Sequence, residues 1–566
     1  MAQPEIASAP PIPAALGAAG AGRPLRPEEA VRRRRPLLIG LFAFVLLAEF
    51  ALGFYYAYVI GYMHSDAMSR VANAFYVLYS RDPHLAAIGF VWNPLPSLVD
   101  MLFLLLYPIV PAMASAGLAG IIMSSLFAAG TTVLLAAAGI RYRLGTATSV
   151  ALALLYSLNP FVFLFGSNGL SDAPFNFFII WSVLSFIRWF HEEKPFGLVA
   201  ASFTLALAFW TRYEAVPFGV ALFGGTLIAT LLIHRRAKAK PLEQRRWGYQ
   251  SVRAEGTLIL LLAPAVYSGL LWVWWNYLIM GNPLYFLNSE YSNVAQAAPL
   301  MGDTTFKSMV GNPWLSLIKV ARKTAYYAIP LGVIVLLRLL SRRLLQWDFA
   351  ILCLMFVSIP AMQYVMLMKG TTFAWFRYFM YVFPITVAWL PYELSQARGR
   401  ITARALVFAG LLGSAALLTY AMTNPKIAPD ENTFLTLGTY YDSQKLDRSI
   451  ADYFDREMPD ATIMMDSSSA FTIIVNSKKP QRYVITSDRI FRQALTEPIA
   501  HGVDYILIPK PMPESSLSTI NTTYPNLYEK GAVWCEFYKD FGGGKWRMYK
   551  VTGFARPDLQ RQTGKE

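Results

Sequence analysis

Long apolar runs dominate this sequence and constrain its fold more than any other feature. A helix needs about 20 apolar residues to cross about 30 Å of hydrocarbon. Charged residues make up only 15% of the chain, too few to cover a water-facing surface. The sequence therefore predicts a mainly α-helical, polytopic membrane domain with about 11 spans. The runs are Leu37–Ile60, Ala114–Ile140, Thr146–Gly166, Ala173–Phe190, Phe196–Trp210, Val216–Ile233, Thr257–Met280, Ala325–Leu340, Phe349–Met368, Tyr378–Leu390 and Ala403–Met422.

The basic residues predict the orientation of these spans. The net charge of +15 would suggest nucleic acid in a soluble protein, but cytoplasmic loops of membrane proteins also collect Lys and Arg. With this set of spans, every basic cluster falls on the same side as Arg32–Arg35, which predicts a cytoplasmic N-terminus and no nucleic-acid partner. The clusters are Arg141 and Arg143, Lys194, Arg235–Lys240 with Arg245 and Arg246, Arg338 with Arg342 and Arg343, and Arg398 with Arg400 and Arg404.

One further apolar segment, Leu95–Pro111, does not fit as a span. Counting it would move every later basic cluster to the outer side of the membrane. The segment also contains Asp100 and has prolines near both ends. These features favour a helix that lies in, or dips into, the outer membrane face, with a true span as the alternative.

Two regions flank the predicted membrane domain, residues 37–422. Residues 1–36 are rich in Ala, Pro, Gly and Arg, which predicts a disordered, basic cytoplasmic leader without the pattern of a removable signal peptide. Residues 423–566 mix polar and apolar residues, which predicts an extracytoplasmic α/β domain. Two cysteines, Cys353 and Cys535, exclude a disulfide framework.

Short elements are expected within the C-terminal domain. Lys445–Glu457 has helical spacing, and strands are expected at Thr462–Met465, Phe471–Val475, Tyr483–Thr486 and Tyr505–Ile508. Trp534–Tyr538 and Lys545–Lys550 are further strand candidates, and Ser467–Ser469 and Gly542–Gly544 favour turns. The domain carries no motif that indicates catalysis.

Two acidic residues at the predicted outer face are the main candidates for catalysis. Asp66 follows the first span, and Asp172 precedes the fourth. Acidic groups at a membrane face cost free energy unless they are partnered, so they often mark function. A carboxylate there can act as a general base on an acceptor hydroxyl, and a second can orient the acceptor or share a metal. The alternatives are a solvated loop residue for Asp66 and a helix cap for Asp172.

Basic residues on the same face can bind an anion. Arg377 can grip a phosphate bidentately, with Lys369 nearby in sequence, although a snorkelling interfacial arginine is the alternative. Arg212 and Glu214 are secondary candidates because they can simply pair with each other. If a divalent metal ion is bound, Asp66, Asp172 and His64 are its candidate ligands; otherwise His64 is a polar loop residue.

Taken in order, these motifs resemble the GT-C-type membrane glycosyltransferases, especially the protein O-mannosyltransferase and lipid A aminoarabinose transferase relatives. The resemblance covers about residues 37–422. It implies transfer of a hexose or pentose from a polyprenyl-phosphate donor at the extracytoplasmic face, with Asp66 as catalytic base, Asp172 as a second acidic residue, and Arg377, assisted by Lys369, near the donor phosphate. The matching motifs are Asp66, Asn93–Pro96, Ser171–Pro174, Thr211–Ala215 and Arg377–Tyr378.

One departure from the family pattern narrows the expected acceptor. The protein O-mannosyltransferases carry an Asp-Glu pair at the first motif, whereas Asp66 is followed by Ala67. This favours a prokaryotic plasma-membrane relative that acts on a cell-envelope glycan, a glycolipid or another acceptor, with inversion at the sugar. The alternative is a transporter or flippase of lipid-linked saccharides, but such carriers usually show inverted repeats and polar residues at the membrane midplane.

Overall fold

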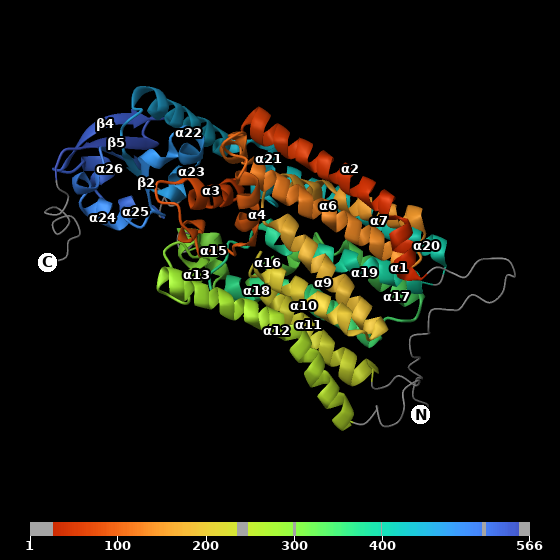
Figure 1. Ribbon diagram of the computed structural model, residues 1–566. Helices are drawn as coiled ribbons and strands as arrows, with labels where there is room; N and C mark the ends of the chain where they lie inside the picture. Colours follow the sequence, from red (N-terminus) through yellow and green to blue (C-terminus); the bar gives the residue numbers. More distant parts are fainter. Residues whose placement is uncertain (1–25, 235–246, 298–301, 398, 512–516, 554–566) are drawn as a thin grey trace.

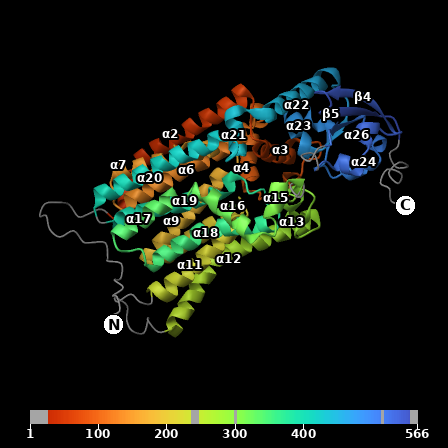
Figure 2. The same cartoon turned by 180° about the vertical axis from the view of Figure 1, so that it is seen from behind.

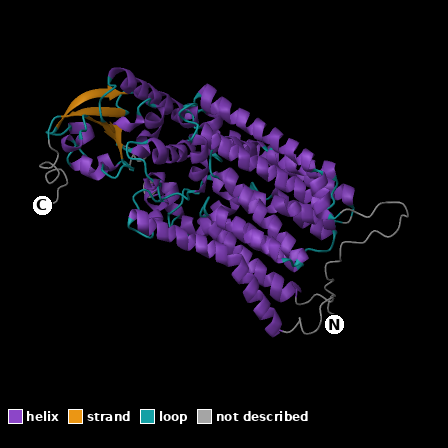
Figure 3. Ribbon diagram, viewed as in Figure 1, coloured by secondary structure: helices purple, strands orange, loops and turns teal. Residues whose placement is uncertain are grey.

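A helical bundle and a smaller α/β domain make up the protein. The computed structural model describes residues 26–234, 247–297, 302–397, 399–511 and 517–553. Figure 1 shows the α/β domain, drawn in blue, at one end of the bundle, with helix α1 at the opposite end. Strands are confined to this domain, and the bundle itself is helical (Figure 3).

Among the described residues, seven helices are long and apolar enough to cross a membrane. Two bent pairs raise that number to nine if each pair is one span. The long helices are α2 (Arg35–Phe54), α6 (Leu118–Arg141), α9 (Asp172–Glu192), α11 (Ala215–Leu227), α12 (Trp247–Met280), α18 (Trp347–Met368) and α20 (Arg400–Thr423). The π-helical residues Tyr55–Ile60 and Ile228–His234 extend α2 and α11.

The two bent pairs break where a proline starts the second helix. Helix α7 (Thr146–Ser157) meets α8 (Pro160–Ser167) at 70°, and α16 (Pro313–Ala325) meets α17 (Ile329–Leu340) at 78°. Proline lacks a backbone N–H and disfavours helical conformation in the residue before it, so it ends one helix and starts the next. Asn159 stabilises the start of α8 because its side chain accepts a hydrogen bond from the Phe161 N–H.

The two remaining predicted runs form short helices. These are α10 (Pro195–Phe209) and α19 (Val382–Gln396), each of 15 residues. A 15-residue helix spans about 22 Å, less than the hydrocarbon thickness. The structure therefore has seven to nine candidate spans by length and composition, and eleven stays a prediction.

The basic clusters gather at the end of the bundle that carries α1 (Pro27–Arg33). Arg188 pairs with Glu28 at 2.8 Å, Arg253 pairs with Glu193 at 2.5 Å, and Arg404 donates to the Leu144 carbonyl at 2.8 Å. These contacts connect segments far apart in sequence at one end of the bundle. The predicted basic residues within 235–246 and Arg398 lie outside the described residues.

The structure revises two predicted boundaries, the end of the disordered leader and the end of the apolar segment Leu95–Pro111. The leader is helical rather than disordered from Pro27 onward, because α1 leads directly into α2; residues 1–25 lie outside the described part. Helix α4 (Leu95–Leu104) is apolar but only 10 residues long, about half of what a span needs. Its length agrees with a dipping helix better than with a twelfth span.

The C-terminal domain is built on a five-stranded mixed sheet with the order β2-β1-β3-β5-β4. Strands β1, β2 and β3 pair in parallel, and β5 pairs antiparallel with both β3 and β4. All five strands overlap predicted segments, and β3, β4 and β5 each extend past the predicted end. They are β1 (Ile463–Met465), β2 (Tyr483–Ile485), β3 (Tyr505–Pro509), β4 (Cys535–Phe541) and β5 (Trp546–Val551).

One predicted strand, Phe471–Val475, was wrong. These residues belong to helix α23 (Ser467–Asn476), and Ser467–Ser469 form its first turn rather than a loop. The reason is topological: β1 and β2 are parallel, and parallel neighbours need a crossover connection, which is usually a helix. The turn predicted at Gly542–Gly544 is present between β4 and β5, and all three glycines have positive φ.

The sheet domain is anchored on the end of the bundle opposite α1. Helix α22 (Gly438–Glu457) joins it to the bundle, and α23 packs against α3 (Ser65–Tyr79). On its surface, Arg489 Nε donates to Asp82 at 2.9 Å. Seen from behind, α3, α4 and α21 (Pro429–Thr436) lie between the bundle and the domain (Figure 2). This junction holds the candidate site.

Candidate functional site

Three segments distant in sequence meet at this junction and form a charged cluster. Asp66 lies in the first turn of α3, Arg377 in the 3-10 turn Phe376–Phe379, and Asp430 in the first turn of α21. Asp66 Oδ2 accepts from Arg377 Nη2 at 2.6 Å, and Arg377 Nε lies 3.6 Å from Asp430 Oδ2. The structure thus brings together Asp66 and Arg377, which the sequence placed in the same site.

His64 closes the cluster from the other side. Its Nε2 lies 3.1 Å from Asp430 Oδ1, and its Nδ1 accepts a hydrogen bond from the Asp66 N–H, so it caps α3. Gly61, with φ of 81°, ends the preceding helix and lets the chain turn toward α3. Both ring nitrogens of His64 therefore have partners, which leaves neither available to a metal in this arrangement.

Asp66 is the accessible member of the cluster. Its side chain is 40% exposed, against 5% for Arg377 and 18% for Asp430. Burial raises the pKa of the Asp66 carboxyl, but the Arg377 guanidinium and His64 outweigh burial and hold this pKa below its usual range. Asp66 is therefore deprotonated at neutral pH and can accept a proton or a hydrogen bond from a bound hydroxyl.

The neighbours of Asp66 also have shifted pKa values. Burial disfavours charge on His64 and Asp430, yet their mutual attraction raises the pKa of His64 and lowers the pKa of Asp430. Burial also opposes charge on Arg377, but Asp66 and Asp430 raise the pKa of the guanidinium well above its usual value. Its Nε and Nη1 are buried and make no hydrogen bond within the described chain. Arg377 thus has donor capacity left for an anion.

A second cluster surrounds Asp172, at the start of α9. Tyr381 donates its hydroxyl to Asp172 Oδ1 at 2.5 Å, and Arg212 Nη1 lies 3.5 Å from the same oxygen. Arg212 also pairs with Glu214 at 3.0 Å, as predicted, and donates to Ser171 Oγ at 3.2 Å. Ser171 holds the N-cap position and Asp172 is already helical, so the structure does not support the cap alternative for Asp172.

Arg70 lies electrostatically between the two clusters. It is buried on α3, donates to the Asn93 carbonyl at 3.3 Å, and stacks over Trp92 at 4.6 Å. Burial and then Arg212 lower the pKa of Arg70 to about 10, and Asp66, Asp100 and Asp172 oppose them. The charges of both candidate carboxylates, Asp66 and Asp172, therefore act on the pKa of Arg70, which lies between the two clusters.

Sequence reasoning missed Asp430, Arg70 and Tyr381. Arg70 carries a local signal, because it follows Asp66 by four residues and so shares a helix face with it. Tyr381 follows Arg377 closely in the same outer segment. Asp430 has no such signal, since it follows the last span and reaches the site through the tertiary fold.

Two other predictions gain no support from the geometry. Lys369 follows α18 with an exposed side chain and forms no ion pair within the described residues. Across the described residues, no group of three or more His, Cys, Asp and Glu side chains is arranged to hold a metal ion. Asp66, Asp172 and His64 are thus not assembled as a ligand set.

The comparisons with known proteins point to one family. Residues 101–244 match the family model described as dolichyl-phosphate-mannose-protein mannosyltransferase. This region includes Asp172, Arg212 and Glu214, covers about a quarter of the chain, and leaves Asp66 and Arg377 outside. No curated protein gives a significant match. The match confirms that the chain resembles the GT-C-type membrane glycosyltransferases, a group whose reaction takes a sugar from a lipid-linked donor.

Proposed function

We propose that the protein transfers a sugar from a polyprenyl-phosphate carrier to a glycan, glycolipid or protein acceptor at the extracytoplasmic face. The observation that carries this proposal is the pair of Asp66 and Arg377, a half-exposed carboxylate 2.6 Å from a buried guanidinium. A base next to an anion-binding group is what transfer from a phosphate-linked sugar to a hydroxyl requires.

In this proposal Arg377 binds the donor phosphate. Its Nε and Nη1 make no hydrogen bond within the described chain, and a guanidinium donates two parallel hydrogen bonds to phosphate oxygens through Nη2 together with Nε or Nη1, so such a phosphate shares Nη2 with Asp66. When the carrier phosphate leaves with the electron pair of the sugar–oxygen bond, the guanidinium offsets the developing negative charge. A phosphate on Arg377 would also compete with Asp66 for the guanidinium, which would free the carboxylate for the acceptor.

Asp66 then takes the proton of the attacking hydroxyl. The hydroxyl oxygen forms the new bond to the anomeric carbon as the bond to the carrier phosphate breaks. One displacement with one base inverts the configuration at that carbon. The exposure of Asp66 supports this role, because an acceptor arriving from water can reach it.

The Asp172 cluster has a different proposed role. Asp172 is fully buried and held by Tyr381 and Arg212, so it positions these side chains rather than contacting the acceptor. Arg212 also lies over the Tyr381 ring at 5.3 Å, which fixes the guanidinium against the outer segment. We propose that Asp172, Arg212 and Glu214 hold the neighbouring side chains in position and do not contact the reacting groups.

The gathering of basic clusters at the α1 end supports the proposed orientation. Lys and Arg concentrate on the cytoplasmic side of membrane proteins. A prokaryotic plasma-membrane protein with its basic end in the cytoplasm would expose residues 423–566 and the Asp66 site outside. The membrane domain would then comprise residues 37–422, as the sequence predicted.

The test is transfer by the purified, full-length protein in liposomes. A labelled sugar on polyprenyl phosphate serves as donor and an extract of cell-envelope glycans as acceptor, and mass spectrometry identifies lipids that co-purify with the protein. We expect a bound polyprenyl phosphate or its sugar conjugate, and transfer that Asp66→Asn abolishes while Asp460→Asn, a control whose side chain is 94% exposed, retains it. Movement of the intact donor across the membrane without transfer would identify a transporter or flippase instead.

A further inference from the structure

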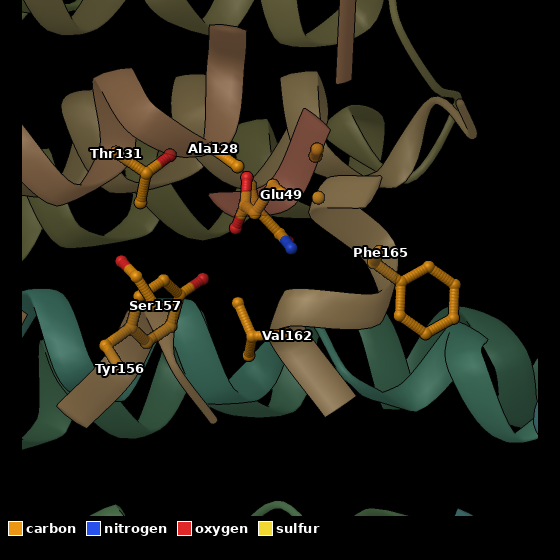
Figure 4. Close-up of a pocket in the computed structure, with 10 residues that line it drawn as sticks. Glu49, Ala128, Thr131, Tyr156, Ser157, Val162 and Phe165 are labelled. Atoms are coloured by element: carbon orange, nitrogen blue, oxygen red, sulfur yellow. The ribbon is translucent and has the colours of Figure 1, made fainter. Parts of the chain in front are cut away.

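A small polar cavity lies inside the bundle, below the Asp172 cluster. Glu49 reaches it from α2, Thr131 from α6, Tyr156 and Ser157 from α7, and Asn176 from α9. Figure 4 shows the Glu49 carboxyl extending into the space above Tyr156, Ser157 and Val162. Asn176 follows Asp172 by one helical turn, so the cavity begins about 6 Å deeper along α9. None of the Asp66 or Asp172 cluster residues lines it.

Glu49 is fully buried and unpaired near the middle of the first span. Its side chain is 0% exposed, and within the described chain both carboxyl oxygens lack a hydrogen-bond partner. The same holds for the Tyr156 hydroxyl and Asn176 Oδ1. An isolated carboxylate in such surroundings carries a large desolvation cost, so something must neutralise it. Three unpartnered polar groups around one cavity indicate a site rather than a single packing defect.

The backbone around the cavity is shaped to admit the carboxyl. A Cβ atom added at Gly166, on α8, would lie 2.4 Å from the carboxyl carbon of Glu49, so only glycine lets the carboxyl approach this closely. The Gly166 carbonyl accepts hydrogen bonds from Ser124 at 2.8 Å and Ser125 at 3.1 Å. These bonds hold the glycine in place on the far side of the recess.

We propose that this cavity binds one small monovalent cation, with sodium as the best fit. Its volume of about 10 Å³ holds about one water-sized particle. The carboxylate of Glu49 supplies one negative charge, which matches a monovalent ion. Oxygens of Thr131, Tyr156, Ser157 and Asn176 complete a hard ligand set. A magnesium ion, which keeps several of its waters, would need more room.

Bound sodium would neutralise Glu49 and tie together four helices beneath the Asp172 cluster. It would also brace the 70° bend between α7 and α8, because Tyr156 and Ser157 lie at the end of α7. The expected consequence is a sodium-dependent stability of the membrane domain. A proton on Glu49 with a water molecule in the cavity is the rival occupant, and it makes a different prediction.

Thermal unfolding of the full-length protein in detergent tests the proposal. Tm is measured in sodium chloride and in choline chloride at equal ionic strength, and we expect sodium to raise Tm saturably by about 1–3 °C. Glu49→Gln keeps the shape but removes the charge, and it should abolish the sodium response. Glu536→Gln, an exposed glutamate on β4, is the matched control and should keep the response.

Radioactive sodium binding gives a second measurement that does not depend on how the variants fold. The wild-type protein should bind one ion per chain, and excess unlabelled sodium should displace it more effectively than potassium. Equal Tm in sodium and choline, or a sodium response that survives Glu49→Gln, would overturn the proposal. A pH-dependent difference in Tm between the wild-type protein and Glu49→Gln, without a response to sodium, would assign the cavity to the protonated carboxyl and a water molecule.

Discussion

Two arginine–carboxylate clusters lie at opposite ends of the bundle and are alike in composition. They differ in how many of the arginine's donor nitrogens make hydrogen bonds. At the basic end, Arg338 donates to Glu393 from Nε at 2.8 Å and to Asp348 from Nη1 at 3.0 Å, and its Nη2 bonds to both carboxylates. At the outer end, Arg377 bonds to Asp66 from Nη2 alone. The first cluster has every donor nitrogen engaged, and the second retains unused donors.

The two clusters also differ in the solvent exposure of their side chains. Arg338, Asp348 and Glu393 are all buried, whereas the Asp66 side chain is 40% exposed. A saturated, buried cluster is suited to hold helices together, while an accessible cluster with unused donors is suited to bind a ligand. The comparison therefore predicts that substitutions in the Arg338 cluster lower stability and that substitutions in the Arg377 cluster lower activity.

The largest effect is expected for Asp66→Asn. The amide keeps the shape but cannot take a proton, so the transfer rate should fall by about 10³-fold, within the range typical of general-base loss. The lost ion pair is partly exposed, so its stability effect should stay within about 1 kcal/mol. The measurement is sugar transfer per folded molecule, with Tm recorded on the same sample. Retained transfer would remove Asp66 from the role of base.

Arg338→Ala should produce the opposite result. It leaves Asp348 and Glu393 buried beside each other with Arg343 farther off, at 3.7 Å from Asp348 and 3.6 Å from Glu393, and breaking a buried pair costs about 3–5 kcal/mol. We expect a much lower Tm or poor recovery of folded protein, with normal transfer per molecule that does fold. A variant with wild-type Tm and reduced transfer would contradict the division between the two clusters.

The sequence predicts features that depend on neighbouring residues better than features that depend on contacts between distant segments. Apolar runs and basic loops are local signals; the runs locate the long helices, seven to nine of which are candidate spans, while the count of eleven and the orientation stay predictions. Asp66 and Asp172 were found because acidic residues next to apolar runs stand out in sequence. Helix α23 was misassigned because its apolar residues fit a strand locally, and only the parallel pairing of β1 with β2 requires a helix there.

The role of Asp430 in the site could not be predicted from the local sequence. Its segment, α21, returns over the bundle after the last span and places a carboxylate on both His64 and Arg377. No spacing relates residue 430 to residues 64 and 377, so only the tertiary fold reveals that the segment leading into the C-terminal domain contributes to the site. The bend between α7 and α8 is similar in kind, since the run Thr146–Gly166 reads as one span.

Arg377→Ala should weaken donor binding by about 10- to 100-fold, the effect of losing a charge-assisted, bidentate phosphate contact. Since Arg377 is proposed to act on the donor, KM for the donor should rise and KM for the acceptor should stay near its wild-type value. Arg456→Ala, which removes an exposed arginine of the C-terminal domain, is the matched control. Unchanged donor affinity in Arg377→Ala would place the phosphate elsewhere.

The smallest expected effect concerns the pH dependence that His64 and Asp430 impose on the outer cluster. The pKa of His64 is raised in the folded protein, since attraction to Asp430 and Asp66 outweighs burial. A raised pKa contributes stability that is fully present below the unfolded pKa of about 6.5 and is lost as pH rises through the folded value. Wild-type Tm should therefore fall over that range.

Asp430→Asn removes the main partner of His64, so the pKa of His64 should drop and the step in Tm should shrink and move to lower pH. His64→Gln should remove the contribution of His64 and leave a smaller step, because burial raises the pKa of Glu431, Asp447 and Asp488 to about 7. Asp66 stays deprotonated near neutral pH, so transfer should change only a few-fold. A Tm profile that is the same in His64→Gln as in the wild-type protein would show that His64 does not titrate in this range, and the outer cluster would then resemble the saturated one more than its open donors suggest.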